Sequence, residues 1–402
     1  MASHRHLEVL IVGAGPVGLF TALLLAKRDI HVRIIDRRER TNVHSYALAL
    51  HPQSLRLLDG VGLATSVAAA GHWVETVEFK GEGNTGARVD LTALAGSYPY
   101  VVVVPQGALE SRLEGALQQC GVRVEWDSEL DVLEEQDGAR QATIRRYQLQ
   151  PQGYPVVQMH RMAAGMRHQS ARYVIGTDGY HSSVRRALGI DYQAREGGRS
   201  FAVYEFESGA PPRHASTVVL ANGRHNVLWP LGGGVQRWSF EISAASEVPD
   251  NPEQGLAKFI AERAPWFQDE VRAVRWSTMV RFERRVAATF GEGATWLAGD
   301  AAHCGNPIGV HSLNLGLKEA HELAWRLYDI LRDEGGHKLL DEYNATRREE
   351  WLRMVGASGS LVPGPGANPW VAEHKDDILA CTPCSGVDLR DALSQLHLDF
   401  HA

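Results

Sequence analysis

Three glycines near the start of the chain have the spacing of a phosphate-binding turn. Gly13, Gly15 and Gly18 follow the pattern G-x-G-x-x-G, directly after the apolar run "LEVLIV". The first glycine permits a tight turn, the second lets a pyrophosphate approach the backbone, and the third lets a helix pack closely on a strand. Asp36, eighteen residues after Gly18, suits a carboxylate that accepts hydrogen bonds from a ribose. These residues predict a dinucleotide site, and a glycine-rich turn without a ligand is the alternative.

A second group of residues has the pattern of a ligand site at the end of a strand. The segment 297–327 reads "LAGDAAHCGNPIGVHSLNLGLKEAHELAWRL" and places Asp300 just after an apolar strand. In open α/β sheets, ligands bind beyond the carboxyl ends of the strands. Apolar residues recur every three or four positions from Leu313, which predicts a helix with Ser312 as its cap. The start of that helix would face Asp300 across the loop 307–309, which suits an electron-rich ring and a polyol chain. A capped strand-loop-helix with a solvated aspartate is the alternative.

The elements that would position these residues alternate along the chain. After the first apolar run, "PVGLFTALLLAKRD" has helical spacing and "HVRIID" is a second apolar run, so a βαβ unit is predicted. Later, "ARYVIGTDGYHSSVRRALGI" predicts a strand that ends at Gly176, a turn at Asp178 and Gly179, and a short helix from about Ser182.

Short strands dominate two other parts of the sequence. Alternating patterns occur at about 76–104 and again at about 199–286, where runs such as "SFAVYEFE" and "QRWSFEIS" are separated by Gly, Pro and Asn turns. The chain is therefore expected to leave its first domain and return to it. The expected fold is α/β, with a discontinuous Rossmann-like domain at 1–75, 101–182 and 286–355, an inserted β-rich substrate domain at 76–100 and 183–285, C-terminal helices, and an unassigned tail at 356–402.

The overall composition argues against several classes of protein. The formal net charge of -7 offers no general attraction for nucleic acid. No apolar run is long enough to span a bilayer, and the N-terminal residues lack a signal-peptide core, so a cytoplasmic location is expected. Four cysteines do not make a disulfide framework in a chain of 402 residues. The tail motif "CTPC" could be a redox pair or half of a zinc site, but there is no second CxxC, so a surface tail without metal is the preferred interpretation.

The three segments together resemble a known family. GAGPVG, then TDG, then AGDAAH followed by P-x-G and a helix resemble, across most of the chain, the FAD-dependent aromatic hydroxylases of the p-hydroxybenzoate hydroxylase type, which are group A flavoprotein monooxygenases. The resemblance implies that the discontinuous domain binds FAD. It also implies that NAD(P)H reduces FAD and that a flavin hydroperoxide then transfers one oxygen atom from O2 to an aromatic or polyketide-like small molecule.

The resemblance implies cofactor contacts for particular residues. The ADP part of FAD would lie near Gly13, Gly15, Gly18 and Asp36, with Gln106 and Leu130 as further neighbours; Asp178 would serve both FAD and the reductant; and the ribityl chain and ring would contact Gly299, Asp300, Pro307, Leu313 and Asn314. Because the sequence has a single glycine fingerprint and no second βαβ unit with its own glycine-rich turn, NAD(P)H is expected to dock only transiently.

Three positions depart from the family pattern. The family loop reads roughly G-G-x-G-[ML]-N, whereas this chain has Val310 and Ser312 at two of the glycine positions. If those positions require a positive φ, the loop must be rebuilt, because a β-branched valine is strongly disfavoured there. The usual arginine before "ALALHP" is replaced by Tyr46, which removes a positive charge near the flavin.

Candidates for catalysis and substrate binding come from residue type. A phenolic substrate would be activated by a base that titrates near neutral pH. His311, in the loop that would face the flavin, is the candidate for this base, although a histidine that only packs is the alternative. The β-rich region supplies candidate pocket residues, which could equally be core: Tyr204, His225, Trp229, Trp238 and Phe240.

Two other functions stay open on the sequence. One is a different flavin-dependent oxidoreductase, a reductase or a halogenase, but the halogenase segment W-x-W-x-I-P is absent and "NVLWPLGG" is a poor substitute. The other is a flavin-binding protein without turnover that shields a reactive intermediate. The altered loop and the missing arginine keep this second function possible.

Overall fold

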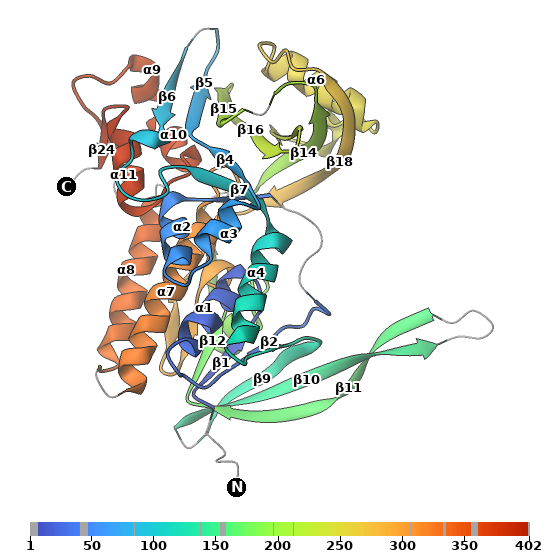
Figure 1. The fold of residues 1–402 in the computed structure, drawn as a ribbon, viewed down its shortest axis with the longest axis vertical. Helices are drawn as coiled ribbons and strands as arrows, with labels where there is room; N and C mark the ends of the chain where they lie inside the picture. The colour runs from blue at the N-terminus through green and yellow to red at the C-terminus, as the bar shows by residue number, and fades with distance from the viewer. Residues whose placement is uncertain are drawn as a thin grey trace.

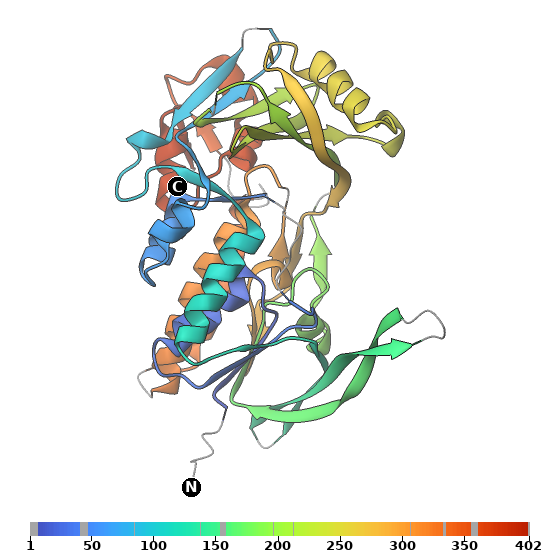
Figure 2. The same ribbon diagram turned by 45° about the vertical axis from the view of Figure 1, so that its right-hand side comes forward.

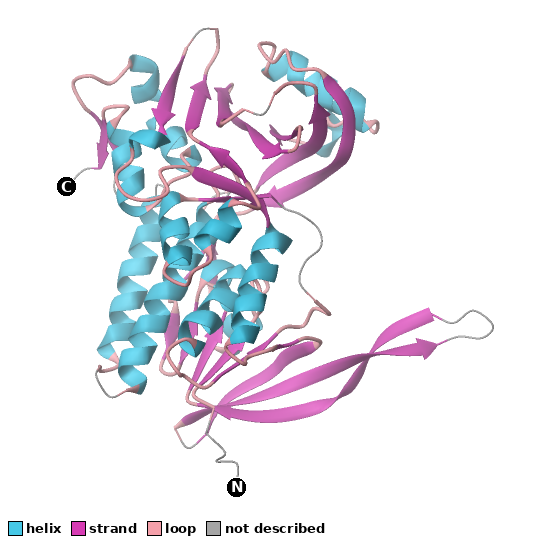
Figure 3. Cartoon of the chain, viewed as in Figure 1, coloured by secondary structure: helices cyan, strands magenta, loops and turns pink. Residues whose placement is uncertain are grey.

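The structure is a computed structural model of the chain and describes residues 7–40, 47–83, 85–136, 138–152, 158–195, 197–211, 213–305, 307–332, 335–354 and 361–400. Figure 1 shows a lower part, built from helices and a parallel sheet, and an upper part, built mainly from strands. The secondary-structure view in Figure 3 shows the same division, with a long ribbon of strands that projects from the lower part. The expected α/β class is confirmed.

A six-stranded sheet forms the centre of the lower part. Its strand order is β20-β21-β12-β1-β2-β8, with bounds Gly291–Glu292, Thr295–Leu297, Tyr173–Gly176, Val9–Val12, Val32–Ile35 and Val124–Glu125. All but the edge strand β20 pair in parallel. Strands β1 and β12 are completely buried, which explains their continuous apolar sequences. The βαβ unit predicted from the first forty residues is thus present as β1-α1-β2.

Helices cover this sheet. The main ones are α1 (Pro16–Ala26), α4 (Gln106–Gln119), α7 (His311–Leu331) and α8 (Lys338–Met354), with α5 (Ser183–Ala187) after β12. Helix α1 packs against both α7 and α4, so nearly all of its side chains are buried. Helix α7 starts at His311 with Val310 at the N-cap position. The prediction that Ser312 caps this helix is therefore wrong, because Ser312 already lies in its first turn.

A seven-stranded sheet dominates the upper part. Its order is β18-β14-β17-β16-β15-β5-β6, with bounds Val271–Phe282, Arg199–Ser208, Val235–Ile242, Arg224–Gly232, Ala215–Ala221, Thr76–Lys80 and Gly86–Asp90. Helix α6 (Pro252–Arg263) packs on one face and forms a separate apolar core with it. Strands from the two β-rich stretches of the sequence thus share one sheet, while the exact domain boundaries stay a prediction.

Smaller elements connect the two parts. A three-stranded sheet joins β3 (Ala47–Leu50), β7 (Val101–Pro105) and β4 (His72–Val74), with α2 (Pro52–Asp59) and α3 (Ala64–Ala68) beside it. A second one joins β13 (Tyr192–Ala194), β19 (Arg285–Ala287) and β22 (His303–Cys304). Here β19 and β22 bring the end of the upper domain next to the segment that carries Asp300.

A projecting ribbon was not foreseen from the sequence. Strands β9 (Ser128–Gln136), β10 (Ala139–Gln152) and β11 (Gln158–Ala171) form an antiparallel sheet that extends away from the lower part (Figure 2). At its base, Arg161 donates hydrogen bonds to the carboxylate of Asp127 and to the carbonyl of Arg37. The ribbon is thereby tied to the chain that follows β2.

The C-terminal tail is folded and packs on both parts. It contains β23 (Leu361–Pro363), α9 (Pro369–Glu373), α10 (Lys375–Cys381), α11 (Gly386–Ser394) and β24 (Leu398–Phe400). Cys381 and Cys384 are fully buried free thiols. The interpretation of "CTPC" as a surface tail is therefore wrong. Within the described residues, we find no helix that combines the length and the apolar character needed to cross a membrane.

Candidate functional site

One large cavity joins the segments that the sequence singled out. It has a volume of about 1030 Å³ and reaches Gly13 and Gly15 at one end and Asp300 and Leu313 at another. Pro307 also lines it. Ligand sites for small molecules usually measure about 300 to 1,000 Å³, so this cavity is large enough for a bulky cofactor. Asp300 and the Gly13 turn, far apart in sequence, thus share one space.

The glycine turn has the geometry that the spacing predicts. Gly13 has a φ of 105°, and a Cβ there would lie 2.4 Å from the carbonyl oxygen of Thr177. A Cβ on Gly18 would lie 1.9 Å from the carbonyl oxygen of Gly13, so this position permits the close approach of α1. A Cβ on Gly15 would meet nothing within 4 Å. Backbone N–H groups at the start of α1 are therefore open to an anionic ligand.

Asp36 closes this turn from the end of β2. The buried carboxylate accepts hydrogen bonds from the backbone N–H of Ala14 at 2.7 Å and of Arg38 at 2.8 Å. The guanidinium of Arg38 also donates to it at 3.1 Å. Gln106 and Leu130 line the cavity beside it. The residues expected around the ADP part of FAD are thus gathered at one end of the cavity.

Asp178 lies where the cavity passes the end of β12. Its Oδ2 accepts hydrogen bonds from the backbone N–H and the hydroxyl of Ser183, at 2.6 and 2.7 Å, and so caps α5. Its Oδ1 is buried and has no partner. A buried carboxylate oxygen without a donor usually indicates an absent water or ligand group. A ribityl hydroxyl of FAD could donate to this oxygen, and together with the open backbone at Gly15 this makes the cavity chemically suited to FAD.

The strand β21 ends in a turn that α7 holds in place. Gly299 has a φ of 63°, and its N–H donates to Oε2 of Glu319 on α7 at 2.8 Å. His303 is fully buried, lies 2.6 Å from Oε1 of the same carboxylate, and stacks on Trp351. Asp300 is left exposed to the cavity. Protein atoms on its other sides desolvate the carboxylate, which raises its pKa.

The residue before α7 has left-handed backbone although it is a valine. Val310 lines the cavity with φ 52° and ψ 35°. Of the six non-glycine residues with positive φ in the described part of the chain, it alone is β-branched. The position thus has a positive φ, and the valine occupies a conformation that costs it energy; whether the loop is rebuilt relative to the family stays a prediction. Ser312 has helical geometry and needs no positive φ.

Asn314 does not line the cavity. Its Oδ1 accepts hydrogen bonds from the N–H of His51 and the hydroxyl of Ser54, at 2.8 and 2.7 Å. Its Nδ2 donates to the carbonyls of Ala49 and Val310, both at 2.8 Å. The side chain thus joins α7 to the start of α2, and only its backbone could reach a cofactor. Leu313, the residue before it, does face the cavity.

His311 is turned away from the cavity. The residue is buried, neither of its ring nitrogens makes a hydrogen bond, and its ring lies edge-on to that of His51 at 5.5 Å. Burial, followed by the nearby Arg284 cation, lowers the pKa of His311 to about 4. Its position argues against the role of substrate base. His181 is the histidine of the described chain that the cavity does reach.

The wall opposite the glycine turn comes from the seven-stranded sheet. Alternate side chains of a strand point to opposite faces, and Val203 of β14 pairs with Ser239 of β17 while Tyr204 pairs with Trp238. Val203 and Ser239 line the cavity, whereas Tyr204 and Trp238 belong to the core against α6. From β18, Thr278 and Val280 line the cavity as well.

None of the five aromatic-pocket candidates lines the cavity. Tyr204, Trp238 and Phe240 lie in the α6 core, and Trp229 is buried in the main core. His225 is buried in a polar network with Arg199 and Asp377. Residue type favoured large aromatic side chains, but the apolar face of these strands is the one that α6 covers. The strand periodicity in "QRWSFEIS" could have separated the two faces.

Several cavity residues were not foreseen from the sequence. They lie at a strand end, in a turn, on helix α5 or on the cavity face of the upper sheet, and they are Arg37, Arg38, Tyr180, His181, Arg186, Val203, Arg237, Ser239, Trp276, Thr278, Val280, Arg281, Phe282, Glu283 and Cys304. The Arg237 guanidinium forms an ion pair with Glu205. Burial raises the pKa of the Cys304 thiol to about 11, so it stays protonated. Tyr46, the third departure from the family pattern, lies outside the described residues.

Curated proteins that are similar to this chain in sequence include monooxygenases. The chain is 27% identical to pentachlorophenol 4-monooxygenase of Sphingobium chlorophenolicum over 378 residues, which cover 89% of this chain and 65% of that protein. It is 28% identical to 6-methylpretetramide 4-monooxygenase of Streptomyces rimosus, over 87% of this chain and 61% of that protein. The chain thus spans less than two thirds of the length of these relatives.

Comparison with solved structures supports the fold. The crystal structure of p-nitrophenol 4-monooxygenase from Pseudomonas putida DLL-E4 superposes with a TM-score of 0.71 at 22% identity, over 97% of both chains. The family model described as "FAD binding domain" matches residues 6–358. The cavity, its glycine turn and its unpaired Asp178 oxygen fit that cofactor. The chain belongs to the FAD-binding domain family of flavoproteins, and FAD is its cofactor.

Proposed function

We propose that the chain is an FAD-dependent monooxygenase that uses NAD(P)H and O2 to hydroxylate an aromatic or polyketide-like small molecule. The relatives named above are monooxygenases, and the resemblance of the sequence motifs points the same way. A cytoplasmic location is part of the proposal, because a reducing compartment suits four free cysteines and supplies NAD(P)H.

The observation that carries the proposal is the continuity of the cavity. One end has the turn for the ADP part, and the α7 start and Asp300 lie further along. The remaining wall combines apolar side chains, such as Val280 and Phe282, with the hydroxyls of Ser239 and Thr278. An aromatic substrate with hydroxyl or carbonyl groups fits such a wall. A substrate bound there would lie in the same enclosed space as the cofactor.

Bound FAD would supply the redox chemistry and the activation of O2. The protein's own residues bind, orient and exclude water. The Gly15 backbone and α1 would hold the pyrophosphate, Asp36 and Asp178 would accept hydrogen bonds from hydroxyl groups, and the N-terminus of α7 would favour negative charge near Leu313. The apolar wall would keep water from the reacting substrate.

Turnover of the purified protein tests the proposal. The visible spectrum would show bound flavin, and NAD(P)H oxidation would be followed with and without candidate phenols. We expect oxidation to be stimulated by a phenol and the product to carry one atom from 18O2. Flavin that binds but gives no oxygenated product with any reductant or phenol would contradict the proposal.

A flavin-binding protein without turnover is the second candidate. The observation that favours it is the left-handed Val310, whose side chain faces the cavity at the start of α7, where the family has glycine. In that case, bound flavin would stay oxidised after NADH and NADPH are added. The spectrum after reductant therefore separates the two candidates.

A further inference from the structure

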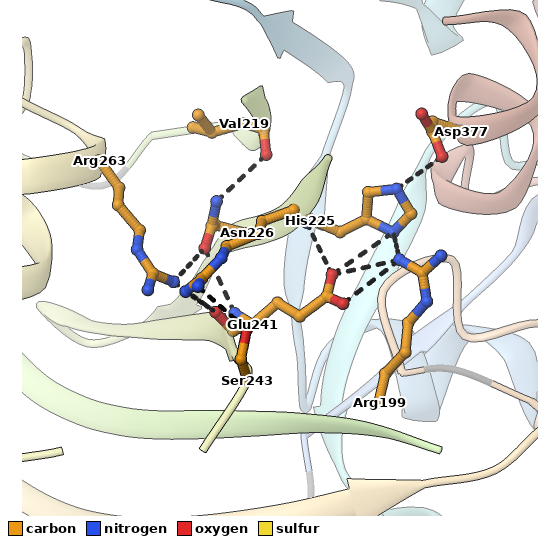
Figure 4. Close-up of polar contacts among 9 residues, drawn as sticks. Arg199, Val219, His225, Asn226, Glu241, Ser243, Arg263 and Asp377 are labelled. Atoms are coloured by element: carbon orange, nitrogen blue, oxygen red, sulfur yellow. Dashed lines mark hydrogen bonds and ion pairs between the residues drawn. The ribbon is translucent and has the colours of Figure 1, made fainter. Parts of the chain in front are cut away.

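Helix α10 of the C-terminal tail is latched to the upper sheet by a buried histidine. Asp377 on α10 accepts a hydrogen bond from Nε2 of His225 on β16 at 2.7 Å (Figure 4). On the other side of the ring, Nη1 of Arg199 lies 2.9 Å from Nδ1. A guanidinium can only donate, so Nδ1 accepts and the ring proton resides on Nε2. This tautomer is the one that donates to Asp377.

Charges around the latch fix its geometry. The Glu241 carboxylate accepts a hydrogen bond from the backbone N–H of His225 at 2.8 Å and pairs with Arg199 at 3.2 Å. The hydrogen bond from His225 lowers the pKa of Asp377, so this carboxylate is charged at neutral pH. Figure 4 shows that the polar contacts continue from Glu241 to Asn226 and Arg263. The α10 helix is therefore attached to a part of the sheet whose side chains are joined by several polar contacts.

The other end of α10 packs closely against Gly309, just before α7. Gly309 lies so close to it that a Cβ there would be 2.6 Å from the carbonyl oxygen of Ala380. The carbonyls of Leu379 and Ala380 also face His311 and oppose the lowering of its pKa. About one turn of helix thus separates Asp377, which is bound by His225, from Ala380, whose carbonyl contacts Gly309.

The segment that α10 contacts, at the start of α7, has a strained backbone and poorly satisfied histidines. Val310 has the left-handed backbone that β-branched residues avoid. The ring nitrogens of the buried His311 make no hydrogen bond of normal geometry, although the carbonyls of Leu379 and Ala380 lie near them. The Nε2–H of His51 donates a hydrogen bond to the carbonyl of Gly309 at 2.8 Å, but its Nδ1 is buried without a partner. Such costs persist only where the surrounding structure enforces them.

We propose that α10 is a clamp that holds the start of α7, residues 309–312, in the strained conformation that places Val310 against the cavity, and that His225 and Asp377 are positioning residues for the FAD site. They act through the Ala380 contact on Gly309, the residue before Val310, without touching the cofactor. The proposal rests on FAD binding and is independent of whether the protein hydroxylates a substrate.

FAD affinity gives the main test. Asp377→Ala should weaken FAD binding about tenfold, since binding must then restore the strained loop; the dissociation constant is measured by flavin fluorescence on apoprotein. In a Val310→Gly background, the same change should have less than a twofold effect, because glycine holds the loop conformation unaided. Asp376→Ala is the matched control, as Asp376 is an exposed neighbour on α10 that pairs only at the surface with Lys375, and it should bind like the wild type.

The apoprotein gives a test that needs no cofactor. Val310→Gly should raise Tm by about 2 °C in the clamped protein and by clearly less in Asp377→Ala, where the loop has already relaxed. Asp377→Asn, which keeps an acceptor oxygen for His225, should behave like the wild type and is the conservative control. Asp377→Ser, whose shorter side chain cannot reach His225, replaces Asp377→Ala if that variant does not fold. The visible absorption band of bound flavin should shift in Asp377→Ala and should return to its wild-type position when Val310→Gly is combined with Asp377→Ala.

Two results would overturn the proposal. One is an unchanged FAD dissociation constant and an unchanged Val310→Gly effect on Tm after the latch is broken. The other is the same loss of FAD affinity in the wild-type and Val310→Gly backgrounds, which would mean that α10 acts on the fold in general. Failure of hydroxylation alone would leave both measurements as expected, so the two proposals fail separately.

Discussion

The cavity is bounded at two ends by turns with left-handed backbone, and they are built in different ways. At the ADP end, Gly13 takes a φ of 105° without steric cost, and the chain packs around it. At the α7 end, Val310 takes a φ of 52° against its own preference. The first turn is therefore encoded locally by its residues. The second depends on contacts from α2, α7 and the C-terminal tail.

The comparison suggests how strain is distributed in this molecule. The glycine turn must receive a pyrophosphate in one fixed geometry, and its positive φ falls on a glycine, which adopts it without support from elsewhere; Thr177 only adds a hydrogen bond from its hydroxyl to the carbonyl of Gly13 at 2.9 Å. The α7 loop is held by the backbone of Ala380 and by the hydrogen bond from His51 to Gly309. Its conformation can therefore respond to changes far away in sequence.

The largest effect is expected from a substitution that disrupts the glycine turn. In Gly18→Ala, the new Cβ would lie 1.9 Å from the carbonyl oxygen of Gly13, so helix and turn must move apart. We expect the free energy of unfolding of the apoprotein to fall by about 4 kcal/mol or more, measured by urea denaturation.

A control substitution at another helical glycine shows whether the loss is specific to Gly18. Gly115 lies inside α4, and a Cβ there would meet nothing within 4 Å. Gly115→Ala should stabilise the protein by about 0.5 to 1 kcal/mol, since alanine favours helix. Equal losses in the two variants would mean that the Gly13 turn has no special packing requirement.

The next effect is the pH dependence of the α7 end. The pKa of His311 is about 4 in the folded protein, below the value of about 6.5 in the unfolded chain, so the unfolded state binds the proton more readily. The contribution of His311 to the free energy of unfolding is therefore complete above pH 6.5 and is lost as the pH falls toward 4. Between pH 6.5 and 5, the wild type should lose about 2 kcal/mol more stability than His311→Phe.

Urea denaturation of both apoproteins at the two pH values checks this. His51, whose pKa is also held well below its ordinary value by burial, is present in both proteins, so its contribution cancels. Parallel pH profiles of wild type and variant would show that His311 does not remain neutral on folding.

A smaller effect tests the strain at Val310 directly. Val310→Gly should raise the free energy of unfolding by about 1 kcal/mol, because the relief of the left-handed valine exceeds the added flexibility of glycine in the unfolded chain. Val310→Ala keeps the Cβ in the same backbone region and should give little or no gain. The account of a strained loop would be contradicted if alanine stabilised as much as glycine.

The smallest expected change in stability lies on the cavity face of the upper sheet. Ser239→Val should alter the free energy of unfolding by less than about 0.5 kcal/mol but raise the KM for the phenol found in the turnover assay. Ser277 of β18 pairs with Tyr204 on the opposite face, so Ser277→Val is the control and should leave KM unchanged. A change in KM for Ser277→Val alone would reverse our assignment of the two faces.

The sequence predicts the ADP end of the site well because its geometry is local. Spacing alone places Gly13, Gly15, Gly18 and Asp36 in one βαβ unit, and the structure has them there. The strand end at Asp300 and the long helix after it are predictable for the same reason. Each depends on residues within a few positions of one another.

The substrate side and the loop at His311 are not predictable in this way. Which face of β17 meets the cavity depends on where α6 packs, so Trp238 and Phe240 could be read as pocket residues although they are core. The orientation of His311 depends on His51 and on a tail helix some seventy residues later. These contacts join parts of the chain that no local pattern relates.

FAD titration of apoprotein with an altered Gly15 most directly tests whether this cavity holds the cofactor. Gly15 has an extended backbone and open space beside it, so Gly15→Val should fold with nearly wild-type stability while its side chain occupies the space for the pyrophosphate. We predict that wild-type apoprotein binds one FAD per chain and that Gly15→Val binds none at the same concentrations. Equal binding by the two proteins, or none by the wild type, would contradict the account.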